Sequence, residues 1–170
     1  MREFFREFGP LVNRLVWRLL GADRDHDDVV QQSFLNLFEA AGGVREARAL
    51  PAWVACVTVN TVRRELRRRK LLRLFFPPAA PPPAPAVPGA DAERRMFLER
   101  CYVFLERMST EDRIVFSLRF IEGYTLEEVA QLCGCSLATA KRRLARARQK
   151  FSELAARDSL LGAMLEGGGS

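Results

Sequence analysis

The sequence is poor in the residues that build metal centres and acid–base sites. Its 170 residues include one histidine, His26, and four cysteines that follow no Cys-x-x-Cys spacing, so a zinc site is not expected. The one cluster of carboxylates lies between residues 23 and 28, where helix capping and partner contacts explain it better than metal or acid–base chemistry. We therefore expect no catalytic residue, no metal, no cofactor and no enzymatic activity.

The chain also lacks a long hydrophobic run. Its longest uncharged stretch, from Leu74 to Ala90, contains seven of the nine prolines, and a helix interrupted in this way cannot satisfy its backbone hydrogen bonds inside lipid. The first residues, MREFFREF, mix both charges with aromatic side chains, which is not typical of a secretory signal. We expect no membrane insertion and a cytoplasmic location, where the cysteines stay reduced.

Strand-like alternation of polar and apolar residues is absent, and apolar residues recur instead at helical spacing. The first half predicts three helices. One runs from about Phe4 to a stop at Gly21, one from the acidic turn at 23–28 to the glycines at 42 and 43, and one from Pro51 into an arginine run. The expected fold class is all-α.

A proline- and alanine-rich segment divides the chain. Residues 77–88 hold seven prolines and no charge, a composition that favours extended polyproline II, and at ~3.1 Å per residue they could hold two bodies about 35 Å apart. We expect two small helical domains, 1–74 and 93–158, joined by a linker at 75–92 and followed by a flexible tail at 159–170.

The second half carries the pattern of a helix-turn-helix. Thr125 and Glu128 fit a capping box at the start of a short apolar helix. Gly134 interrupts that helix, and Ser136 can cap the next one. The buried stripe of this last helix is predicted to be Leu137, Ala140, Leu144 and Ala147. Two short helices joined by a glycine turn, the second rich in cations, are typical of a DNA-binding helix-turn-helix.

Positive charge is concentrated in two windows. Seven basic residues and one acid lie between residues 63 and 73, and six basic residues and no acid between 141 and 150, whereas the whole chain has a formal net charge of only +6. The body outside the windows is therefore acidic. Arginine and lysine can donate to guanine or neutralise phosphates, and the Asn60 amide just before the first window can read a base edge. The sequence predicts a DNA partner.

Two classes of DNA-binding protein fit these features. The second half alone is equally typical of a stand-alone helix-turn-helix regulator that binds operator DNA by itself. Such a regulator usually carries a β/α receiver ahead of the helix-turn-helix, whereas the first half here shows no strands. The alternative is a protein whose first half also binds nucleic acid.

Three stretches resemble the extracytoplasmic-function (ECF) sigma factors of bacterial RNA polymerase, within the sigma-70 family. They are DVVQQSFLNLF at 28–38, PAWVACVTVNTVRRELRRR at 51–69, and the helix-turn-helix stretch at 111–151. They occur in the family's order, with the linker where the family has one. The resemblance implies a transcription initiation factor that binds core polymerase, recognises and melts the minus-ten element and reads the minus-thirty-five element.

The resemblance also implies roles for individual residues. The clamp helices of the polymerase's largest subunit would contact Asp28, Val29, Gln31, Gln32 and Leu35, which we expect to lie off the core face of the second helix. The minus-ten element would meet Val44, Arg45 and Asn60, with Arg63, Arg64 and Arg67 on the backbone. The minus-thirty-five element would meet Lys141, Arg142, Ala145 and Arg146, with Arg148 on a phosphate. Promoter DNA and an anti-sigma factor are the further partners implied.

Overall fold

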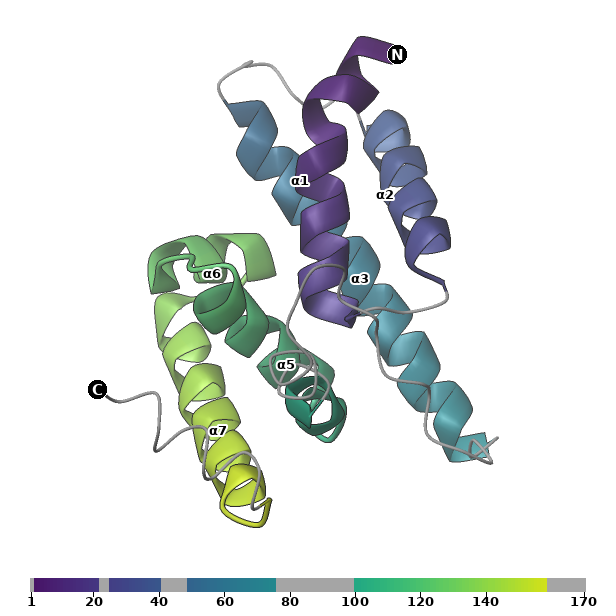
Figure 1. Ribbon diagram of the computed structural model, residues 1–170. Helices are drawn as coiled ribbons and strands as arrows, with labels where there is room; N and C mark the ends of the chain where they lie inside the picture. Colours follow the sequence, from purple (N-terminus) through teal and green to yellow (C-terminus); the bar gives the residue numbers. More distant parts are fainter. Residues whose placement is uncertain (1, 22–24, 41–48, 76–99, 159–170) are drawn as a thin grey trace, which may run out of the picture.

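The structure, a computed structural model, describes residues 2–21, 25–40, 49–75 and 100–158. Every regular element within these ranges is a helix, which confirms the predicted all-α class. The elements are α1 (Arg2–Leu20), α2 (His26–Ala40), α3 (Leu50–Phe75), α5 (Thr110–Phe116), the π-helix η3 (Ser117–Ile121), α6 (Leu126–Cys133) and α7 (Leu137–Ala155), and residues 100–106 are also helical (Figure 1). None of the helices in these ranges is both long and apolar enough to cross a bilayer.

The first three helices pack along one another, with α1 in contact with both α2 and α3 (Figure 1). α1 ends where the sequence predicts, at Gly21, whose φ of 80° is accessible to glycine but strained for other residues. A Cβ at this position would also meet the Tyr102 ring at 2.9 Å. The glycine therefore both ends the helix and admits an aromatic side chain from the second half.

The helix-turn-helix forms through the predicted caps. The Thr125 hydroxyl accepts from the Glu128 amide at 3.2 Å, and the Glu128 carboxylate accepts from the Thr125 amide at 2.7 Å. Gly134 ends α6 in the left-handed region, with φ of 62°, and the Ser136 hydroxyl accepts from the Thr139 amide to begin α7. These local bonds set the turn between α6 and α7.

Thr125→Ala tests the capping box. We expect it to lower the free energy of unfolding by about 1 kcal/mol, because the Glu128 amide loses its acceptor. Urea unfolding followed by circular dichroism measures the change. Ser152→Ala is the control, since Ser152 is exposed in the last turn of α7 and makes no cap of α6. Equal unfolding midpoints for Thr125→Ala and the parent would show that the capping box contributes nothing.

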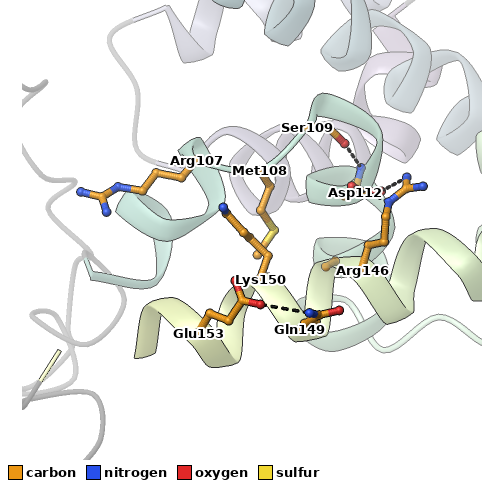
Figure 2. Close-up of a pocket in the computed structure, with 9 residues that line it drawn as sticks. Arg107, Met108, Ser109, Asp112, Arg146, Gln149, Lys150 and Glu153 are labelled. Atoms are coloured by element: carbon orange, nitrogen blue, oxygen red, sulfur yellow. Dashed lines mark hydrogen bonds and ion pairs between the residues drawn. The ribbon is translucent and has the colours of Figure 1, made fainter. Parts of the chain in front are cut away.

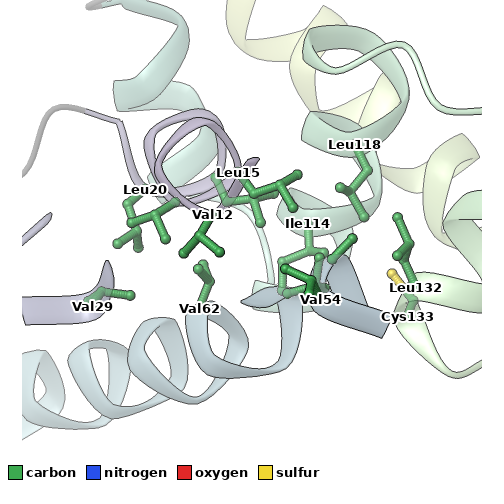
Figure 3. Close-up of a cluster of buried hydrophobic side chains, with 14 of the residues drawn as sticks. Val12, Leu15, Leu20, Val29, Val54, Val62, Ile114, Leu118, Leu132 and Cys133 are labelled. Carbon is green, nitrogen blue, oxygen red and sulfur yellow. The ribbon is translucent and has the colours of Figure 1, made fainter. Parts of the chain in front are cut away.

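One hydrophobic core runs through both halves of the chain. The side chains of Val12, Leu15, Val54 and Val62 from α1 and α3 belong to the same buried cluster as Ile114, Leu118 and Leu132 from the second half (Figure 3). Helix α3 packs against both α5 and α6, and α1 packs against η3. The separation that an extended linker would allow is therefore not adopted, and the two halves lie in direct contact.

Candidate nucleic-acid interface

The predicted minus-thirty-five residues lie on the outer face of α7. Lys141, Arg142, Ala145, Arg146 and Arg148 are all exposed, while the predicted stripe residues Ala140, Leu144 and Ala147 are buried. The separation follows from the helical period, since positions three and four apart share a face. The outer face of α7 thus combines cations with one small residue, a surface that fits a major groove.

Arg146 is already engaged by a carboxylate. Its Nη2 lies 2.7 Å from Asp112 Oδ1 and its Nε 3.3 Å from Asp112 Oδ2, and the hydrogen bond to this carboxylate raises the pKa of Arg146. The Asp112 amide in turn donates to the Ser109 hydroxyl, which caps α5. Figure 2 shows the pair at the edge of a 280 Å³ pocket that Lys150 also lines. Asp112 thereby orients one of the predicted base-reading arginines.

The predicted minus-ten face of α3 is partly covered. Arg64 and Arg67 are exposed, but the Arg63 side chain retains only 13% of its accessible surface and Asn60 is half-buried. Arg63 Nη1 donates to Asn60 Oδ1, and Asn60 Nδ2 donates to Cys56 Sγ at 3.7 Å. The side-chain amide predicted to read a base is thus occupied on both of its polar atoms.

Glu111, in the first turn of α5, forms ion pairs with three arginines from two helices. Its carboxylate lies 3.4 Å from Arg63 Nε, 2.6 Å from Arg67 Nη2 and 3.2 Å from Arg143 Nη1. These four residues are called the Glu111 cluster below. Arg143 lies in the cationic window at 141–150, but only 22% of its side chain is accessible. No local pattern marks Glu111, since its arginine partners come from distant parts of the chain.

Four of the five α2 residues that the resemblance assigns to polymerase binding are exposed. Asp28, Gln31, Gln32 and Leu35 are exposed, and Leu35 presents 51% of its surface. Val29, by contrast, is 5% exposed and belongs to the core, so the expectation that it lies off the core face is wrong. The reason is periodicity: Val29, Ser33 and Leu37 follow one another at four-residue spacing and form the buried stripe.

A groove of 590 Å³ lies between α2 and α3 and connects the two predicted surfaces. Asp28 and Gln32 line it from α2, and Arg64 lines it from α3. Asn36 joins the two helices, because its Nδ2 donates to Thr61 Oγ1 at 2.8 Å while its Oδ1 accepts from Gln32 Nε2 at 3.1 Å. A polymerase contact on α2 would therefore lie beside the proposed DNA face of α3.

Two predicted site residues, Val44 and Arg45, lie outside the described residues. Within the described ranges, no group of three or more histidine, cysteine, aspartate or glutamate side chains could hold a metal ion. The four cysteines are free thiols. The arrangement of the described residues thus offers surfaces for binding, dominated by arginine and by amide side chains.

The sequence matches two family models. Residues 4–71 match sigma-70 region 2, and residues 98–151 match sigma-70 region 4. The chain is 29% identical over 133 residues to the ECF RNA polymerase sigma factor EcfG of Rhodopseudomonas palustris, an alignment covering 78% of this chain and 72% of that protein. It is 31% identical over 173 residues to the RNA polymerase sigma factor CnrH of Cupriavidus metallidurans, covering 91% of this chain and 89% of that protein.

Solved structures share the fold. The sigma factor RpoE of Bartonella quintana, solved in complex with the anti-sigma factor NepR, superposes with a TM-score of 0.67 at 22% identity and covers 93% of this chain and 99% of its own. CnrH in complex with the cytosolic domain of CnrY gives a TM-score of 0.62 at 27% identity, covering 92% of this chain and 88% of its own.

The match to region 2 settles the choice between the two classes. A stand-alone helix-turn-helix regulator would account for the second half only, whereas here the first half also matches a sigma-70 region and both regions occur in one chain. The likeness to CnrH extends along nearly the whole of both proteins. The chain therefore belongs to the ECF sigma factors of the sigma-70 family, which direct RNA polymerase to promoters.

Proposed function

We propose that this sigma factor works through three surfaces: α2 for core polymerase, α3 for the minus-ten element and α7 for the minus-thirty-five element. The observation that carries the proposal is the cationic outer face of α7 within a chain that also matches region 2. The first domain spans 1–74 and the second 93–158, with a linker at 75–92 and a tail at 159–170. The protein acts by binding rather than by catalysis. It works in the cytoplasm, where the promoter DNA is.

The polymerase surface consists of Asp28, Gln31, Gln32 and Leu35. These side chains point to solvent from α2, and Leu35 is a large apolar side chain with half of its surface accessible. An apolar centre flanked by amides and an acid suits a protein partner better than a phosphate backbone. The clamp helices of the largest polymerase subunit are the proposed partner, and Val29 supports the surface from the core.

The minus-ten surface consists of Asn60, Arg63, Arg64 and Arg67 on α3, together with Val44 and Arg45 in the segment that precedes it. Asn60 can discriminate a base edge through its amide, and the arginines bind backbone phosphates. Arg64 is exposed in the α2–α3 groove and is ready for such a contact. Arg63 and Arg67 have to leave Glu111 before they can bind DNA.

A protein inhibitor is a further proposed partner. The solved relatives were obtained in complex with proteins, CnrH with the cytosolic domain of CnrY and RpoE with the anti-sigma factor NepR. The relatedness to CnrH along most of both chains supports an anti-sigma factor for this protein as well. The exposed Leu35 on α2 is part of the surface for which such an inhibitor and core polymerase would compete.

Transcription with purified core polymerase tests the function directly. The chain added to core should produce transcripts from a subset of genomic promoters, and sequencing their 5′ ends defines the minus-ten and minus-thirty-five elements. Core alone is the control. If the protein binds DNA but core gives the same transcripts with and without it, the proposed function is contradicted.

The arginines of α7 should divide into base readers and phosphate binders. Arg142→Ala should cost about 1–3 kcal/mol at the preferred minus-thirty-five element and much less at a scrambled one, because a bidentate contact to guanine discriminates by that amount. Arg148→Ala should weaken both sites alike, because a phosphate contact carries no sequence information. A series of promoters varied at minus thirty-five, transcribed with each variant, measures both effects. Identical profiles for the two variants would show that α7 supplies charge without reading bases.

A further inference from the structure

We propose that Asp112 of α5 is a positioning residue for promoter recognition: it holds one edge of the Arg146 guanidinium, so that the other edge reads a guanine of the minus-thirty-five element. The inference deepens the role of α7 and rests on the proposed function. It gives an acidic residue that lies outside the cationic window at 141–150 a part in the base specificity of that window.

The contact with Asp112 leaves the reading edge of Arg146 free. Asp112 Oδ1 accepts from Arg146 Nη2 at 2.7 Å, and Asp112 Oδ2 accepts from Arg146 Nε at 3.3 Å (Figure 2). A guanidinium carries its N–H donors in one plane, and this contact occupies the edge formed by Nε and Nη2. The Nη1 and Nη2 groups at the end of the side chain still form a parallel pair of donors. Such a pair matches the O6 and N7 acceptors of guanine.

Asp112 is itself held in place. Its side chain retains only 13% of its accessible surface, and its backbone amide donates to the Ser109 hydroxyl that caps α5. Helix α5 packs directly against α7. The Asp112 carboxylate therefore has a fixed position relative to the helix that carries Arg146.

Arg146, by contrast, remains available to DNA. Its side chain keeps 54% of its accessible surface while it is paired with Asp112. An unpaired arginine side chain loses much rotamer freedom when a base immobilises it, whereas the contact with Asp112 has already restricted these torsions. The entropic cost of ordering Arg146 at the DNA is thereby lowered, as in other preorganised contacts.

The packing of α5 against α7 does not depend on this pair. Phe116 of α5 stacks on Phe151 of α7 with ring centroids 5.1 Å apart. Arg143, one turn before Arg146, joins the two helices through the Glu111 cluster, and only 22% of its side chain is accessible. Because an ion pair with an exposed partner adds little to such packing, orientation of Arg146 accounts for the Asp112 contact better than stability does.

The charge of Asp112 predicts different effects at specific and non-specific sites. A guanidinium released from the carboxylate can reach phosphates and other base edges, and the loss of an acid near DNA reduces electrostatic repulsion. Removing the carboxylate should therefore weaken the preference for guanine without weakening binding to a scrambled minus-thirty-five element. A residue needed only for folding would lower binding to both elements alike.

The test uses the full chain assembled with core polymerase. Asp112→Asn removes the charge at nearly unchanged volume. Glu153→Gln is the matched control, because Glu153 is exposed, lines the same pocket and accepts from Gln149 Nε2 at 3.0 Å (Figure 2). Arg146→Ala, alone and combined with Asp112→Asn, completes a double-mutant cycle.

The readout is the affinity of each assembly for fluorescent promoter duplexes. The parent duplex is a promoter mapped by the 5′-end sequencing described above, and each position of its minus-thirty-five element is changed to each of the other base pairs in turn. A duplex with a scrambled minus-thirty-five element reports the affinity that does not depend on base reading.

Arg146→Ala should abolish a guanine preference at one position, which identifies the base that Arg146 reads. At this position we expect the parent to prefer guanine by about tenfold and Asp112→Asn by only about threefold, with unchanged preferences elsewhere. Asp112→Asn should bind the scrambled duplex at least as well as the parent does. In the Arg146→Ala background, Asp112→Asn should leave base preference unchanged, and Glu153→Gln should behave like the parent throughout.

An equal loss of affinity for the guanine and scrambled duplexes would overturn the inference in favour of a purely structural role. An unchanged guanine preference in Asp112→Asn would overturn it as well, and so would an Arg146→Ala variant that loses no base preference. If circular dichroism shows that Asp112→Asn does not fold, the smaller Asp112→Ser takes its place. Failure of the proposed function is distinguishable, because the parent would then give no promoter-dependent transcripts with core.

Discussion

Replacing Asp28 and Gln32 together by arginine is expected to weaken the binding of this sigma factor to core polymerase by about a hundredfold. Both side chains are exposed on α2, one turn apart, beside the apolar Leu35. Two guanidinium groups introduced into a contact built from an acid, amides and a leucine become desolvated without partners, which costs several kcal/mol. Competition with a labelled parent protein for core polymerase measures the loss.

A matched control exists on α6. Glu127→Arg with Gln131→Arg likewise replaces one acid and one glutamine by arginine at the same spacing, on exposed positions that also begin in the first turn of a helix. It should compete for core as well as the parent does. Circular dichroism should report equal helix content for all three proteins. If the Asp28 and Gln32 double variant also competed like the parent, the polymerase surface would lie elsewhere.

The ends of α1 and α6 and the starts of α6 and α7 were predictable from the sequence because their signals are local. The end predicted at Gly42 and Gly43 lies outside the described residues. A capping box needs only Thr125 and Glu128, and a helix stop needs only a glycine that accepts positive φ, as Gly21 and Gly134 do. The exposed face of α7 likewise follows from the spacing of Leu144 and its neighbours. These features depend on residues a few positions apart, which a single sequence displays.

The change of helix type before Gly123 was not predictable. The sequence indicates one helix that closes at this glycine, but the structure converts it from α to π at Ser117. The Glu122 amide donates to the Ser117 carbonyl at 3.0 Å, a bond that spans five residues. Tertiary packing decides between α and π here, since Leu118 is fully buried and Glu122 reaches α1.

The contact between the halves escaped prediction for a related reason. Helical spacing places Arg63 and Arg67 on one face of α3, but it does not say whether solvent, DNA or another part of the chain covers that face. The partner, Glu111, lies 44 residues beyond Arg67, on the other side of a linker whose composition indicated separation. Charge patterning therefore placed the arginines of α3 on one face but did not predict the carboxylate that pairs with them.

Arg113 is a further residue with no sequence signal and a large structural role. Its side chain is almost completely buried, with Nε donating to the Leu19 carbonyl at 3.0 Å and Nη2 to the Leu20 carbonyl at 3.1 Å. These are orphan acceptors at the end of α1. Burial lowers the pKa of Arg113 to about 10, so the guanidinium remains protonated at neutral pH. One buried cation thereby ties the last turn of α1 to α5.

Arg113→Met should lower the free energy of unfolding by about 2 kcal/mol, because methionine fills the space of the side-chain stem but leaves two buried carbonyl oxygens without donors. Part of this loss is offset, because the variant no longer buries a charged guanidinium. The two backbone carbonyls remain buried, so the net effect is still a loss of stability. Arg113→Lys keeps the charge and can reach one carbonyl, so its loss should be about half as large. Urea unfolding of the full chain, followed by circular dichroism at neutral pH, orders the three proteins. Equal midpoints for the parent and Arg113→Met would mean that the end of α1 needs no donor from the second half.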